Sequence, residues 1–183
     1  DFEGYRQYLV AEVKRLGVTL RPTLERLNAP EKLTLNFAAL LPPDHVALPW
    51  LRALVAKTFP EIARDAEPGH PDPWKNLLRR QFSLRLLQPT GVMDADSQPL
   101  VVRVHRLVQQ LMLRDCSAPE RVGLQKAVDD LATQRAAVLK STTNWVEARW
   151  ELEPFTALAS LWDETSHPAA GWLVNQTGTR WYD

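Results

Sequence analysis

The chain has 183 residues, of which 45% are hydrophobic and 24% charged, and its formal net charge is zero, as in an ordinary globular protein. A neutral chain is not attracted as a whole to nucleic acid or to anionic membranes, although it can carry a local basic patch. A single cysteine, Cys116, excludes an intrachain disulfide, and no apolar run approaches the ~18 residues of a membrane-spanning helix. We therefore expect a cytoplasmic protein without membrane contact. Because the chain starts with Asp1 rather than Met, we also expect it to be an internal piece of a longer polypeptide.

Apolar residues at helical spacing predict four helices in the first part of the chain. Gly17 is expected to end the first helix, and proline and glycine mark a loop over residues 65–73. A connector is expected over residues 44–48. The predicted helices cover residues 2–16, 31–41, 50–58 and 74–81.

Two segments are then expected to pair as a β-hairpin. Residues 82–88 have the look of a strand, and residues 100–104 are rich in β-branched side chains. Residues 89–99 suit an exposed tip between them, and helical spacing returns over residues 105–114. Three helices with a two-stranded hairpin predict a winged-helix domain in which the hairpin is the wing.

The remaining sequence predicts helices in series. A long helix is expected from Pro119 to Lys140, and the next from Trp145, where Pro154 either kinks that helix or starts a new one. A final helix is expected over residues 169–182. Helical hairpins in series are typical of repeat solenoids. The fold class predicted is thus mainly α, a winged-helix domain followed by tetratricopeptide-like (TPR-like) helical hairpins. The predicted parts are a remnant of a preceding helical subdomain (1–30), the winged-helix domain (31–116), and a helical linker with the first TPR-like helices (117–183).

Three segments resemble one known family, the NB-ARC-type STAND signalling NTPases that carry TPR repeats. Residues 102–109, Val-Arg-Val-His-Arg-Leu-Val-Gln, resemble the strand-to-helix segment that holds the family's Met-His-Asp motif. Here the triplet is Val104-His105-Arg106, so the histidine alone is retained. Residues 35–48 resemble the entry to the family's winged helix, and residues 144–155 resemble the linker before its first repeat. The resemblance covers roughly residues 32–183.

This resemblance implies a non-catalytic regulatory scaffold that couples a nucleotide-binding domain to a sensor array of repeats. It implies that His105 contacts the ADP phosphate in the intact parent protein. The bare sequence favours a plainer alternative, a histidine hydrogen-bonded near a helix end. None of the seven glycines precedes Lys-Ser or Lys-Thr at phosphate-loop spacing, so we expect no nucleotide cofactor in this piece and ADP or ATP in the parent. Adjacent domains of the same polypeptide and a protein ligand on the repeats are the expected partners.

The residues predict no enzyme. The four histidines and the lone cysteine lack the spacing of metal ligands, and no nucleophile motif occurs, so no metal site is predicted. Asp94 and Asp96 are interpreted as a solvated turn at the hairpin tip rather than as a metal site.

A basic stretch supports an alternative function. No acidic residue occurs between Trp74 and Met93, and the third helix of the predicted winged helix carries several polar and basic side chains. They are interpreted as a solvated or interdomain face, with the alternative of a DNA-binding regulator that dimerises through its C-terminal helices. These residues are Lys75, Asn76, Arg79, Arg80 and Arg85. Trp172 and Trp181 are expected to be partly exposed where the next repeat is absent, and this is the basis for expecting a homodimer.

Overall fold

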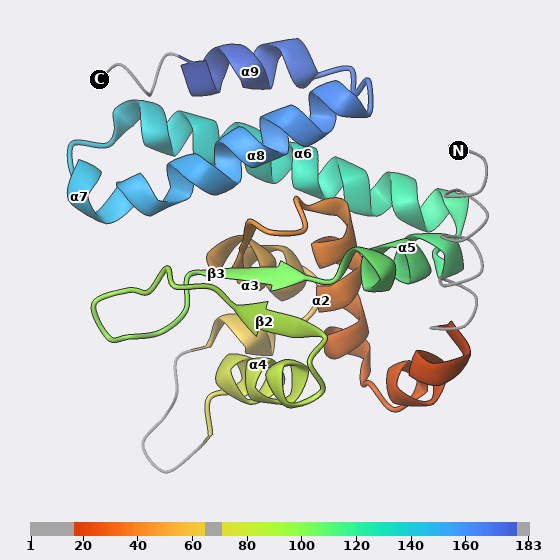
Figure 1. Cartoon of the computed structure of the whole chain (residues 1–183). Coiled ribbons are helices and arrows are strands. Elements are labelled where there is room, and N and C mark those ends of the chain that lie inside the picture. The colour runs from red at the N-terminus through yellow and green to blue at the C-terminus, as the bar shows by residue number, and fades with distance from the viewer. Residues whose placement is uncertain (1–16, 65–70, 179–183) are drawn as a thin grey trace.

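The structure is a computed structural model that describes residues 17–64 and 71–178. These residues form a mainly helical fold with a small three-stranded antiparallel sheet, which confirms the predicted class at that level. Figure 1 shows the sheet and α4 (Pro73–Ser83) on one side of α2 (Ala29–Leu40) and α3 (Leu48–Ala56). A layer of later helices covers the other side of α2 and α3.

The predicted helices over 31–41, 50–58 and 74–81 are confirmed as α2, α3 and α4, with a short 3-10 turn over Pro60–Ala63 between the last two. The expected helix over 2–16 and most of the expected loop lie outside the described residues. Gly17 does not end a helix, because residues 17–25 are helical. Gly17 is buried there, and a Cβ at this position would lie 3.4 Å from Leu111 Cδ1. That distance is an ordinary van der Waals contact, so neither a helix stop nor close packing requires a glycine at this position.

The sheet contains β1 (Val46–Ala47), β2 (Leu87–Pro89) and β3 (Val101–Val104) in the order β1-β3-β2. The predicted hairpin is confirmed in part, since Leu87 lies opposite Val104 in the antiparallel β2–β3 pair. Its first strand is shorter than predicted, because α4 continues through Ser83 and a left-handed residue, Arg85 (φ 55°), precedes the strand.

β1 was predicted only as a connector. It is a two-residue edge strand, in which Val46 lies opposite Val102 and Ala47 opposite Val101. Both of its residues are buried. β3 is consequently the central strand of the sheet.

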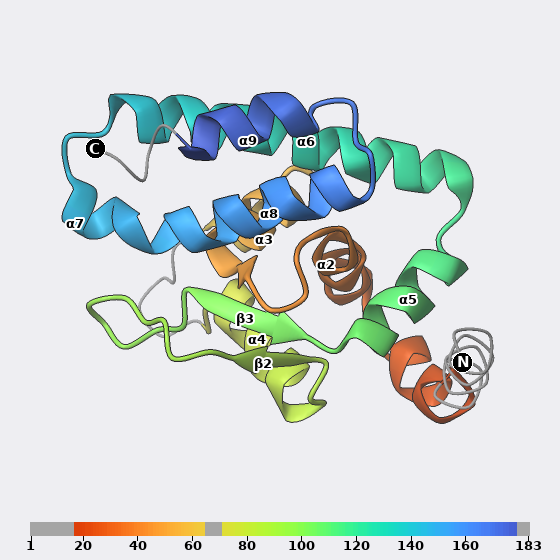
Figure 2. The same cartoon turned by 45° about the horizontal axis from the view of Figure 1, so that its top comes forward.

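After β3 the chain is helical. The later elements are α5 (Arg106–Asp115), α6 (Ala118–Ser141), α7 (Trp145–Ala148), a 3-10 turn (Arg149–Glu151), α8 (Leu152–Glu164) and α9 (Ala170–Gly178). Pro154 lies in the first turn of α8, so it belongs to the start of a new helix, one of the two alternatives in the sequence. Both views show α6, α8 and α9 running beside one another in alternating directions (Figures 1 and 2). Within the described ranges, no helix is long and apolar enough to cross a membrane.

One cluster of buried apolar side chains extends from Leu27 to Leu173 and includes residues from every layer. Trp50 of α3 lies inside it, with its ring 6.1 Å from the ring of Phe155 in an edge-to-face arrangement. α6 packs on both α2 and α3. The layer of later helices therefore shares its core with the first part of the chain.

Candidate functional site

His105 lies where β3 ends and α5 begins. It is the N-cap residue of α5 and keeps an extended backbone, with φ −65° and ψ 130°. Its Nδ1 accepts a hydrogen bond from the backbone N–H of Leu107 at 3.2 Å. Because Nδ1 accepts this hydrogen bond, Nε2 is the ring nitrogen left to donate to a ligand. Because the imidazole is exposed, this Nε2–H donor faces solvent.

Around the imidazole lies a cavity of about 280 Å³, which we call the His105 pocket. Its lining comes from three places in the fold: the connector before β1, the adjacent strands β2 and β3, and the start of α5. Arg106 and Asp44 form an ion pair across it at 3.8 Å, with both side chains more than half exposed, so this pair is weak. The Arg103 side chain has no ion-pair or hydrogen-bond partner among the described residues. The lining residues are Asp44, Gln88, Arg103, Val104, His105 and Arg106.

The His105 pocket offers the chemistry of an anion site. Two guanidinium groups and an imidazole N–H donor lie at the N-terminal end of a ten-residue helix, where the helix dipole favours negative charge. Guanidinium groups suit phosphate oxygens because they donate in a planar fork. Asp44 opposes an anion and is partly neutralised by Arg106. The plainer interpretation of His105 is confirmed, because its Nδ1 caps α5, whereas the phosphate contact stays a prediction.

The basic residues singled out in the sequence lie apart from this pocket. Trp74, Leu77 and Leu78 of α4 are buried, as expected, and the polar face of the helix is exposed. Lys75, Asn76, Arg79 and Arg80 lie on that face, whereas Arg85 is in the turn that follows α4. None of these residues lines the His105 pocket.

Arg80 is engaged within the fold. Its Nη2 donates to the carbonyl oxygen of Arg26 at 2.8 Å, and its Nε lies 3.4 Å from Oε1 of the buried Glu31. Arg79 donates to Asn76 Oδ1 at 2.9 Å, an exposed local contact. The basic face that remains available to a partner therefore consists mainly of Lys75, Arg79 and Arg85.

Asp94 and Asp96 lie in an exposed turn at the hairpin tip, as expected. Asp94 Oδ1 accepts hydrogen bonds from the backbone N–H groups of Asp96 at 2.9 Å and Gln98 at 2.7 Å. Ser97 has a positive φ of 57° between them. The Asp94 carboxylate thus stabilises its own turn by hydrogen bonds to the backbone. In the described residues, no three histidine, cysteine or acidic side chains gather as metal ligands would.

A buried carboxylate that the sequence did not reveal joins the first part of the chain to the later helices. Glu151 is 1% exposed, and its Oε1 accepts from Trp50 Nε1 and from Arg135 Nε, both at 2.6 Å. Its Oε2 accepts from Arg135 Nη2 at 2.6 Å. The bidentate contact with Glu151 raises the pKa of Arg135. We call Trp50, Arg135 and Glu151 the Glu151 junction; nothing in the spacing of these residues indicates it, since Glu151 is 101 positions from Trp50.

A second network missed in the sequence did have a signal. Asn28 followed three positions later by Glu31 is the pattern of a capping box. Glu31 N–H donates to Asn28 Oδ1 at 2.9 Å, and Asn28 N–H donates to Glu31 Oε2 at 2.8 Å. Because Glu31 also pairs with Arg80, the cap of α2 is tied to α4.

Comparison with known proteins found no matching family model, no matching curated protein and no matching solved structure.

Proposed function

We propose that this chain is a non-catalytic regulatory scaffold of a STAND-class signalling NTPase, with His105 as its contact to the nucleotide held by a neighbouring domain. In this proposal the first part of the chain is a winged helix, and α6 to α9 lead into a TPR-like array. The scaffold transmits nucleotide occupancy from one side of the molecule to the other.

The arrangement of elements supports the winged-helix part of the proposal. The helices α2, α3 and α4 precede the β2–β3 hairpin, and the hairpin is extended by β1 to a three-stranded sheet. A hairpin alone would be marginally stable, and here its strand β2 packs against α4. The alternation of α6, α8 and α9 is compatible with helical hairpins at the start of a repeat array.

The observation that carries the functional proposal is the state of His105. The imidazole uses Nδ1 inside the fold and leaves Nε2–H exposed beside Arg103 and Arg106. A ligand phosphate at this place would gain a hydrogen bond that depends on how the neighbouring domain is docked. A contact made in one arrangement alone biases the molecule toward that arrangement.

The chain itself allows a direct test with pyrophosphate as the phosphate probe. Titration followed by NMR of the imidazole carbon-bound protons should move the His105 resonances. His167 is the control away from the His105 pocket, because its Nδ1 likewise accepts from a backbone N–H two residues later, that of Ala169 at 3.2 Å, while its Nε2 lies 3.4 Å from Asp129. If pyrophosphate perturbs the two histidines equally, the proposed phosphate contact is wrong.

A second test uses the polypeptide that contains this chain together with its nucleotide-binding domain. His105→Asn keeps a side chain able to cap a helix and removes the Nε2–H donor. We expect ADP affinity to fall roughly tenfold, the equivalent of one charge-assisted hydrogen bond. His167→Asn should leave ADP affinity unchanged. Absence of a Gly-Lys-Ser or Gly-Lys-Thr phosphate loop upstream in the same polypeptide would remove the role assigned to His105.

The exposed basic face of α4 favours one alternative, a winged-helix DNA-binding regulator. Lys75 and Arg79 are on this face, and Arg85 follows it. DNA binding through these three cations would weaken with salt, with a slope of roughly 3 in a plot of log affinity against log salt concentration. The test is fluorescence anisotropy with Lys75→Ala/Arg79→Ala, which leaves Arg80 and its contact with Glu31 in place. Retained binding in that variant would exclude this face as the DNA contact.

A further inference from the structure

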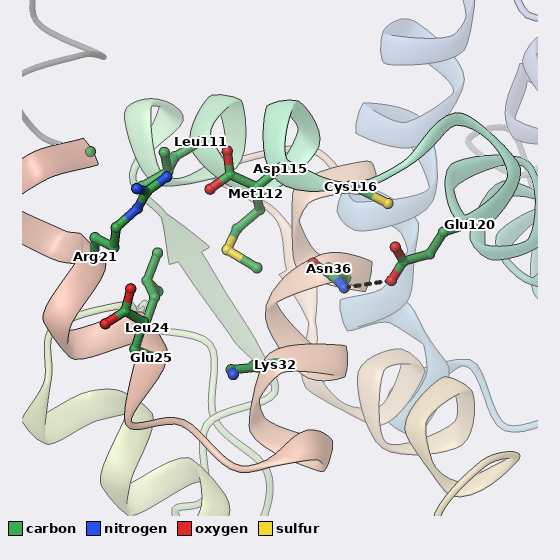
Figure 3. A pocket seen from close by; sticks show the side chains of 11 residues that line it. Arg21, Leu24, Glu25, Lys32, Asn36, Leu111, Met112, Asp115, Cys116 and Glu120 are labelled. Carbon is green, nitrogen blue, oxygen red and sulfur yellow. Dashed lines mark hydrogen bonds between the residues drawn. The ribbon is translucent and has the colours of Figure 1, made fainter.

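A second cavity, of about 390 Å³, lies between helix 17–25, α2, α5 and the start of α6. This volume is within the range of small-molecule sites. Its floor is apolar: Leu111 is buried, and Leu24 and Met112 are half-buried. Figure 3 shows the Met112 side chain entering the space between helix 17–25 and α2, with Leu24 reaching toward it. We call this space the α2–α5 cavity.

Charged side chains of both signs surround this floor. Two of the acids are engaged: Asp115 pairs with Arg114 at 3.1 Å, and Glu120 accepts from Asn36 at 3.4 Å, the dashed line in Figure 3. The other three charged side chains of the lining are Arg21, Glu25 and Lys32.

The side chains of Arg21, Glu25 and Lys32 have no ion-pair or hydrogen-bond partner within the described part of the chain. Arg21 and Glu25 come from helix 17–25, and Lys32 comes from α2 across the cavity. Because the Asn36 amide is neutral, Glu120 also keeps its charge, so the lining presents two cations and two anions around an apolar floor, which favours a ligand that carries both charges. A purely anionic ligand would meet Glu25, and a purely cationic one would meet Arg21 and Lys32.

We propose that the α2–α5 cavity binds a small zwitterion with an apolar side chain, of the class of a free aromatic or aliphatic amino acid. The carboxylate meets Arg21 and Lys32, the ammonium group meets Glu25, and the side chain lies on Leu24, Leu111 and Met112. The site is separate from the His105 pocket and does not depend on the function proposed above. Because its charged groups are exposed, we expect a dissociation constant for L-phenylalanine on the order of 1 mM.

Cys116 provides a readout confined to this cavity. It is the chain's single cysteine, it is half-buried, and it lies in the cavity lining. A bound ligand should shield its thiol, so the rate of alkylation by iodoacetamide, followed by mass spectrometry of the full chain, reports occupancy. Free glutathione alkylated under the same conditions controls for any effect of the ligands on the reagent.

The experiment compares three probes that share a phenyl group. L-Phenylalanine should slow alkylation severalfold at saturation. 3-Phenylpropionate, which lacks the ammonium group, and phenethylamine, which lacks the carboxylate, should protect less at equal concentration. Arg21→Gln should weaken protection by L-phenylalanine about fivefold, and Arg26→Gln, which changes an exposed arginine outside the cavity, should not.

Two results would overturn the proposal. The first is an alkylation rate that L-phenylalanine leaves unchanged at about ten times the expected dissociation constant. The second is equal protection by all three probes with no effect of Arg21→Gln, which would mean that the charged groups do not select the ligand. Isothermal titration calorimetry of wild-type chain and Cys116→Ser with L-phenylalanine checks that the thiol is a reporter and not the ligand's partner.

Discussion

Glu151 is one of two acidic residues in the described part of the chain whose side chains are almost fully removed from water. Burying a carboxylate costs more free energy than its ion pair returns unless its remaining acceptor sites are also filled. Here two arginine N–H groups and the Trp50 indole N–H fill them. All three donors of the Glu151 junction are therefore needed to compensate the buried charge, and the loss of one leaves the carboxylate poorly compensated.

Removing the arginine tests this directly. Arg135→Ala should lower the free energy of unfolding by about 2–4 kcal/mol, less than for a fully buried pair because the Arg135 side chain is 32% exposed. Adding Glu151→Gln should recover part of the loss, since a neutral amide can still accept from Trp50. Lys126→Ala is the control: it removes an exposed ion pair with Asp130 and should change stability by less than about 0.5 kcal/mol. Urea titrations measure all three. Equal losses for Arg135→Ala and Lys126→Ala would show that the junction adds nothing beyond a surface pair.

The thiol of Cys116 gives a prediction in pH. Burial, followed by the charge of Glu120 and a hydrogen bond to it, raises the pKa of Cys116. The fold thus favours the protonated thiol, and alkylation at pH 8 should be slower than for an unstructured peptide cysteine. Glu120→Gln should lower the pKa and speed alkylation. Asp130→Asn, a neutralised acid elsewhere on α6, should not. A pH–rate profile by mass spectrometry checks the order, and an unchanged profile in Glu120→Gln would contradict it.

At the scale of single elements, the contribution of the α2 cap to the free energy of unfolding can be tested. Asn28 accepts from the Glu31 N–H and lets Glu31 return the bond. Asn28→Ala should cost about 1 kcal/mol in the free energy of unfolding, whereas Asn28→Asp should cost little, because aspartate caps equally well. Glu31→Ala should cost more than Asn28→Ala, since Arg80 also loses its buried partner. Denaturant titration ranks the three variants, and the reverse ranking would show that the capping box is secondary to local packing.

The helices were predictable because each carries its own signal. Proline in the first turn and apolar residues at helical spacing indicated α3 and α4, and their bounds differ from the prediction by a few residues at most. β1 had no such signal: two residues cannot display alternation, and its place depends on pairing with a strand 55 positions later. Phe82 was placed at the start of a predicted strand over residues 82–88. The structure keeps it in α4, where the helix continues to Ser83.

The His105 pocket was likewise predictable only where the signal was local. The valine-rich strand and the helical spacing after it placed His105 at the start of a helix, and that was local information. The structure makes it the N-cap of α5. Gln88 enters the His105 pocket because it lies opposite Arg103 in the hairpin register, and Asp44 enters through the connector to β1. Both contacts are tertiary. The engagement of Arg80 by Glu31 is also tertiary, and it reduces the basic face that the sequence indicated.

At the scale of the whole molecule, α2 is the central element. It packs beside α3, against α4 on the side of the sheet, against α5, and against α6 of the covering layer. Gln109 of α5 ties the two further by donating to the carbonyl oxygens of Ala38 and Leu41 at 3.0 and 2.8 Å. In the proposed function, a displacement at the start of α5 would reach α2, which touches the covering layer, through these contacts. This connection gives the proposed scaffold a physical route between its two sides.

The shared core also predicts how the chain unfolds. The expected division at residues 116 and 117 falls between α5 and α6, yet the apolar cluster continues across it and the Glu151 junction bridges it. We therefore expect one cooperative transition, with a calorimetric enthalpy equal to the van't Hoff enthalpy. Trp50 is a buried residue of α3 that contacts Glu151 and Phe155 on the other side of this division. Trp50→Ala should lower the free energy of unfolding by about 3–5 kcal/mol and keep the transition single. If the two parts were independent domains, the wild-type chain would unfold in two steps. Arg135→Ala would then separate those steps further, since it weakens the contact that couples them.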